Sequence, residues 1–169
     1  MAIYGSDFMD RLGQLLLLLA VCICLYATAV LAAPAQAPVP SARDKCPVCG
    51  MFVAKFPNWV ASSRLKDGTT YYFDGPKDMF THYFDTQRYT PGKRQADIVT
   101  LSVKEYYSLQ MIDARSAFYV SGSNVYGPMG SELIPFATEK DAASFMNDHK
   151  GKRILRFQEI TPAIIKALP

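Results

Sequence analysis

Two stretches of this chain predict the same order of secondary-structure elements, and this repetition constrains the fold more than any other feature of the sequence. The first stretch begins with two strands, 59–65 and 69–73, joined at Lys66-Asp67-Gly68, where the Asp-Gly pair is typical of a hairpin turn. Pro76 opens a helix, and residues 98–103 have the alternating apolar positions of a strand. The first stretch therefore predicts the order ββαβ.

The second stretch predicts the same order again. Strands are expected at 116–120 and 132–136, on either side of a loop over 122–130. Thr138 caps a helix, and a last strand follows at 153–160. A shift of 63 positions aligns three identical residue pairs: Phe73 with Phe136, Asp78 with Asp141, and Asp85 with Asp148. We therefore predict an α+β fold of two tandem ββαβ modules.

A leader and a linker precede the predicted modules. Residues 1–32 contain a nearly uninterrupted apolar run, which is typical of a secretory signal peptide or a membrane anchor. Residues 33–45 hold three prolines among small side chains, a composition that favours an extended linker. We place the first module at 46–111 and the second at 112–169. The leader predicts export to the periplasm or to the outward-facing side of a membrane. Both a cleaved signal peptide and a retained anchor fit this segment.

The composition and the known motifs argue against several classes of function. The formal net charge is +3, and no dense cluster of Lys or Arg indicates nucleic-acid binding. The sequence contains no Gly-x-Ser-x-Gly, no His-Glu-x-x-His and no phosphate-binding glycine loop. Turns, helix caps or surface positions explain Asp67, Asp74, Asp78 and Asp85. We therefore predict a protein that is not an enzyme.

The segment Cys46-Pro47-Val48-Cys49-Gly50-Met51 brings two thiols and a thioether together within six residues. Soft sulfur donors select Cu(I), zinc or iron–sulfur centres. Zinc and iron–sulfur sites rarely use methionine, so Met51 favours Cu(I). A short strand is expected at 51–53, and an extended backbone would direct the side chains of Cys49 and Met51 to the same face.

A third soft ligand is expected from the loop Gly127-Pro128-Met129-Gly130. Met129 does not lie at a core position by periodicity, and the glycines on both sides of the Pro-Met pair allow a close approach to another group. One thiolate with two thioethers would suit Cu(I) and would disfavour hard ions.

Other interpretations of these residues stay open. Cys46 and Cys49 could form a structural disulfide, or a redox-active pair as in a thiol-disulfide redox protein. Met51 could pack in the core, and Met129 could be an exposed loop residue. His82 and His149 are expected to be surface residues, while Met79, Met111 and Met146 fit core positions.

Four motifs occur together in this chain. They are Cys-Pro-x-Cys-Gly-Met from Cys46, Tyr-Phe-Asp-Gly-x-x-x-Met-Phe from Tyr72, Gly-Pro-Met-Gly from Gly127, and Pro-Phe-x-x-x-x-x-Ala from Pro135. Together they resemble the NosL family of nitrous oxide reductase accessory proteins, over residues 46 to about 160. The resemblance implies an outward-facing Cu(I)-binding protein of two ββαβ modules.

The resemblance also implies partners and ligands. It implies Cu(I) bound by Cys49, Met51 and Met129, with Cys46 as a further candidate ligand. The implied partners are nitrous oxide reductase, as the client that receives copper, and a membrane transporter complex. Many relatives are lipoproteins, but this leader lacks a small residue before Cys22 or Cys24, so lipid attachment is not carried over.

Overall fold

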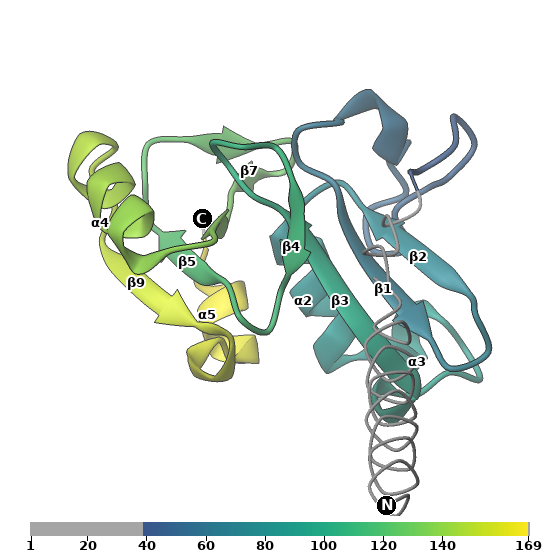
Figure 1. Cartoon of the computed structure of the whole chain (residues 1–169). Coiled ribbons are helices and arrows are strands. Elements are labelled where there is room, and N and C mark those ends of the chain that lie inside the picture. Colours follow the sequence, from purple (N-terminus) through teal and green to yellow (C-terminus); the bar gives the residue numbers. More distant parts are fainter. Residues whose placement is uncertain (1–38, 169) are drawn as a thin grey trace, which may run out of the picture. The chain divides into compact units, whose positions relative to one another are not determined.

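The computed structural model describes residues 39–168, and the first half of this range forms the first predicted module (Figure 1). Its antiparallel sheet has the strand order β2-β1-β3-β4. The elements that build it are β1 (Ala61–Leu65), β2 (Thr70–Phe73), helix α2 (Pro76–Phe84), the short helix α3 (Thr86–Tyr89), β3 (Ile98–Lys104) and β4 (Met111–Asp113). The predicted ββαβ order is confirmed, and a further short strand, β4, joins the sheet after it.

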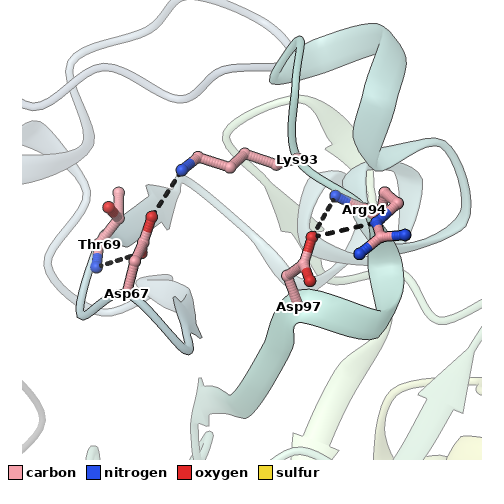
Figure 2. A network of polar contacts seen from close by, with 5 residues as sticks. All are labelled: Asp67, Thr69, Lys93, Arg94 and Asp97. Atoms are coloured by element: carbon pink, nitrogen blue, oxygen red, sulfur yellow. Dashed lines mark hydrogen bonds and ion pairs between the residues drawn. The ribbon is translucent and has the colours of Figure 1, made fainter.

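A polar network at the tip of the β1–β2 hairpin holds the loop that leads into β3 (Figure 2). The Asp67 carboxylate accepts a hydrogen bond from the backbone N–H of Thr69 at 2.9 Å and pairs with the ammonium group of Lys93. The Asp97 carboxylate accepts from the backbone N–H of Arg94 at 3.0 Å, in the short 3-10 helix η2 (Gln95–Asp97). The network connects the hairpin turn to the loop before β3.

The second module repeats the arrangement of the first. Its sheet has the order β8-β5-β9. In each module, the first strand therefore pairs with the second strand on one side and with the strand after the helix on the other. The elements are β5 (Phe118–Ser121), β8 (Ile134–Phe136), helix α4 (Glu139–Asp148), β9 (Arg153–Arg156), the 3-10 helix η3 (Phe157–Glu159) and the terminal helix α5 (Pro162–Lys166). Thr138 caps α4 as predicted, because its hydroxyl accepts from the backbone N–H of Asp141 at 3.1 Å.

Three local predictions differ from the structure. Residues 51–53 form no strand: Phe52 makes one isolated bridge to Lys45, and the 3-10 helix η1 (Val53–Lys55) follows. The predicted loop at 122–130 contains a small hairpin, β6 (Tyr126–Gly127) and β7 (Gly130–Ser131), whose turn is Pro128-Met129. The predicted strand at 153–160 ends at Arg156, because the Glu159 carboxylate binds the backbone N–H of Arg156 and closes a 3-10 turn.

One hydrophobic core is shared by the two modules. Phe80 of α2 contacts Tyr119 of β5 and Phe157 of η3, with ring centroids 5.3 and 5.2 Å apart. A second, smaller core lies between α4 and the other face of the second sheet, around Val120, Phe136 and Phe145. Successive residues of β5 therefore serve different cores, as the alternation of side chains along a strand requires.

Several predictions lie wholly or partly outside the described residues. The leader at 1–32 lies outside them, and the linker at 33–45 is described only from Val39 onward. The predicted boundary between modules at 111 and 112 falls within β4 and stays a prediction. Within residues 39–168, no helix has the length and apolar character that a membrane crossing needs.

Candidate metal centre

The cysteine segment forms a closed loop that holds both thiols near one point. The backbone N–H of Cys46 donates to the carbonyl of Met51 at 2.9 Å, and the N–H of Gly50 donates to the carbonyl of Cys46 at 2.8 Å. Gly50 has a φ of 78°, a left-handed conformation that glycine adopts without strain. The backbone is therefore turned, and not extended, between Cys46 and Met51. Cys46 is buried, while Cys49 and Met51 are half-buried.

Two aspartates face this loop from the end of β2 and the first turn of α2. Asp74 directly follows β2, and its carboxylate accepts a hydrogen bond from the Cys49 thiol at 3.2 Å. Asp78 lies in the first turn of α2, and its carboxylate accepts from the Cys46 thiol at 3.2 Å. One donor atom from each of the four residues lies within 4.8 Å of the other three. The loop and the helix start thus form one cluster of two thiols and two carboxyl groups.

The sequence predicts these aspartates at a turn, a helix start or the surface, and the surface position is wrong for both. Asp74 is 1% exposed and Asp78 is 7% exposed. The N-cap residue of α2 is Gly75, which has no side chain to engage Asp78, and the Asp78 carboxylate turns toward Cys46. Asp67 and Asp85, in contrast, lie at a turn and at an exposed helix end, as predicted.

Burial raises the pKa of both thiols and of one carboxyl group in the cluster. It raises the pKa of the Cys49 thiol to about 12, and it raises the pKa of the Cys46 thiol further. Burial likewise raises the pKa of the Asp78 carboxyl. Both cysteines are free thiols in this structure, and a metal ion must displace their protons to bind the thiolates. The raised pKa values disfavour the redox-pair interpretation, because thiol exchange proceeds through the thiolate; that interpretation stays a hypothesis.

The Met129 hairpin is attached to the same end of α2. The Lys77 ammonium group donates to the backbone carbonyl of Met129 at 2.8 Å. Lys77 precedes Asp78, so this contact connects the β6–β7 turn to the helix turn that faces Cys46. The Met129 side chain is 45% exposed and is available at the surface. The ligand set Cys49, Met51 and Met129 stays a prediction.

A buried carboxyl group holds the hairpin and the helix together. Glu132 follows β7, and its Oε1 accepts hydrogen bonds from the backbone N–H groups of Lys77 at 2.5 Å and Leu133 at 2.8 Å. Gly75 and Gly127 leave the space that this side chain fills, because a Cβ on either would crowd it. A residue of the second module thus caps the helix of the first.

The two histidines have different environments, and neither belongs to the cluster. His82 was predicted at the surface, but it is fully buried against the rings of Tyr71 and Phe73. Its Nε2 lies 3.0 Å from the Thr90 hydroxyl, and burial lowers its pKa to about 4. His149 is half-buried and stacks on Phe145.

Comparison with known proteins identifies the family. A profile of the NosL family matches residues 38–165. The chain belongs to the NosL family. It is 33% identical over 124 residues to the copper-binding lipoprotein NosL of Stutzerimonas stutzeri, a match that takes in 73% of this chain and 65% of that protein. The match therefore spans slightly less than two thirds of that relative.

A solved NosL structure has the same fold. The crystal structure of the copper chaperone NosL from Shewanella denitrificans superposes with a TM-score of 0.66 at 28% identity. The match covers 77% of this chain and 98% of that one. The predicted family and the predicted mixed α and β fold are confirmed.

Proposed function

We propose that this protein is an exported copper chaperone that binds Cu(I) and passes it to a partner by ligand exchange. The observation that carries the proposal is the half-buried Cys49 thiol, which lies at the start of α2 beside the attachment point of the Met129 hairpin. Cys49, Met51 and Met129 are the proposed ligands, with Cys46 as a further donor. A thiolate with thioethers suits a soft monovalent ion. The relatives named as a copper-binding lipoprotein and a copper chaperone support this assignment.

The exposure of the proposed ligands suits transfer in place of storage or catalysis. Met129 is at the surface and Cys49 is partly accessible, so a partner could add a ligand before the ion leaves. A structural metal site, in contrast, is closed by four protein ligands. We propose nitrous oxide reductase as the client and a membrane transporter complex as a second partner. Export through the leader would bring the protein to the side of the membrane where such a client resides.

Titration against a Cu(I)-specific chelator under anaerobic conditions tests the ligand set. Cys49→Ser is expected to remove most Cu(I) binding, because Cys49 is the more accessible of the two cysteines and the one thiolate among the three main proposed ligands. Met129→Leu is expected to weaken binding while thermal melting stays unchanged, since its side chain is exposed. Met111→Leu, a half-buried methionine in β4, is the matched control and should bind as the unaltered protein does. Unchanged affinity in Cys49→Ser would refute the proposal.

A further inference from the structure

The two buried aspartates of the cluster have no role in a Cu(I) site built from sulfur. Carboxylate oxygen is a hard donor, which Cu(I) disfavours and which zinc-class divalent ions accept beside thiolates. Asp74 and Asp78 are both at least nine-tenths buried. A buried carboxyl group without a cationic partner is costly, so these two side chains call for a separate physical explanation.

Asp74 carries an unsatisfied atom. Its Oδ1 accepts from the Cys49 thiol, while its Oδ2 is buried and has no hydrogen-bond partner. Within residues 39–168, the ion pairs join Lys93 to Asp67 and Arg94 to Asp97, and neither involves Asp74 or Asp78. A buried polar atom without a partner is rare in folded proteins. A cation between the aspartates and the thiols would satisfy it.

The spacing of the four donors suits one tetrahedral ion. With metal–sulfur bonds of about 2.3 Å and metal–oxygen bonds of about 2.0 Å, the donors of a tetrahedral zinc site lie roughly 3.3 to 3.8 Å apart. The sulfur–oxygen distance is 3.2 Å in both the Cys46–Asp78 and the Cys49–Asp74 pairs. All four donor atoms lie within 4.8 Å of one another. Small side-chain rotations would therefore complete the coordination shell.

We propose that Cys46, Cys49, Asp74 and Asp78 form a binding site for one divalent cation of the zinc class, with two sulfur and two oxygen ligands. This inference does not rest on the proposed Cu(I) ligands Met51 and Met129. Cys49 belongs to both sets, so a divalent ion and Cu(I) compete for the protein. The two carboxyl groups favour the harder ion, and the proposed thioether ligands favour the softer one.

Cobalt(II) is the probe, because its visible spectrum reports both geometry and ligands. The full chain is purified anaerobically with reductant, in mild detergent because of its apolar leader, and titrated with Co(II). The expected spectrum has the intense d–d bands of a tetrahedral ion and a near-ultraviolet thiolate charge-transfer band. Cu(I) added afterwards should abolish both features by displacing the Co(II).

Two variants and two controls assign the ligands. Asp74→Asn and Asp78→Asn should each lower the Co(II) affinity at least about 10-fold, as loss of a metal-site group typically does. Both should keep the Cu(I) affinity within a factor of about three. Asp85→Asn changes an exposed aspartate at the other end of α2 and should bind Co(II) normally. Met129→Leu should also leave Co(II) binding unchanged.

Two results would overturn the inference. One is a Co(II) spectrum that lacks the thiolate charge-transfer band. The other is equal Co(II) affinity in Asp74→Asn, Asp78→Asn and Asp85→Asn. If the buried substitutions unfold the protein, X-ray absorption of the unaltered zinc-loaded chain decides. Two sulfur and two oxygen neighbours support the site, and a shell of oxygen alone or of sulfur alone refutes it.

Discussion

Glu132 is expected to make the protein less stable as the pH rises from 6 to 9. Burial raises the pKa of its carboxyl group to about 8 from an ordinary value of 4.5. The folded protein therefore binds more protons than the unfolded chain between pH 4.5 and 8, so stability falls over that interval and levels off above it. Two pKa units separate pH 6 from 8, so the loss by pH 9 is roughly 3 kcal/mol.

The contacts of Glu132 act on its pKa against burial. The backbone N–H groups of Lys77 and Leu133 both donate to Oε1 and lower the pKa. Two charged neighbours act in opposite directions: the Lys77 ammonium group lowers the pKa and the Asp78 carboxylate raises it. Burial is the largest of these effects. Glutamine has the shape of a protonated glutamate and keeps an oxygen acceptor, but it does not titrate.

Urea unfolding of the unaltered protein and of Glu132→Gln at pH 6, 7.5 and 9 measures the effect. Between pH 6 and pH 9, Glu132→Gln should gain roughly 3 kcal/mol of unfolding free energy relative to the unaltered protein. Comparison at the same pH cancels the titration of the cysteines, which both proteins share. Glu139→Gln, an exposed glutamate in the first turn of α4, should follow the unaltered protein. Parallel stability profiles for Glu132→Gln and the unaltered protein would refute a neutral Glu132.

Three further predictions follow from single contacts. Lys77→Leu should weaken Cu(I) binding about 3- to 10-fold in a chelator competition, because the Met129 turn loses its hydrogen bond of about 1 kcal/mol. An unchanged affinity would show that this hydrogen bond does not support the copper site. The unaltered protein should lose stability as the pH falls from 6.5 to 4, because His82 binds a proton in the unfolded chain but stays neutral while it is buried. His82→Leu should reduce this loss. For the unaltered protein, urea unfolding should show a loss of roughly 2 to 3 kcal/mol of unfolding free energy by pH 4.5. The same pH dependence in the variant would contradict a pKa of His82 that is lowered by burial. Thr138→Ala should cost about 1 kcal/mol of unfolding free energy through the lost cap of α4, whereas no change would show that the cap is replaced by water.

The repeated ββαβ order could be predicted because its signals are local. The Asp-Gly turn, Pro76 and Thr138 each mark an element boundary within a few residues, and all three lie where the structure has such a boundary. The β6–β7 hairpin was missed because strands of two residues are too short to show periodicity. The η1 helix was missed because its fold depends on the closed backbone of the preceding loop.

The metal centre could be predicted only in part, because its oxygen donors come from elements far along the chain. Cys46 and Cys49 are close in sequence, but Asp74 and Asp78 meet them only after α2 folds against the loop. The repeat did contain a signal. Asp141 engages the cap residue Thr138, whereas the matching cap position before Asp78 is Gly75, which leaves Asp78 without that partner. The burial of His82 was missed because a polar residue in a short helix is ordinarily exposed.

Each half of the described chain lacks something that only the other provides. The first turn of α2 binds a carboxyl group that is encoded more than fifty residues later, and Phe80 would lose its ring contacts with Tyr119 and Phe157 if the second module were removed. A fragment cut between β4 and β5 would leave that apolar surface open and prone to aggregation. Two co-expressed fragments, in contrast, should cover this surface by packing α2 against β5 and η3. We therefore expect the two modules to unfold together as one cooperative unit.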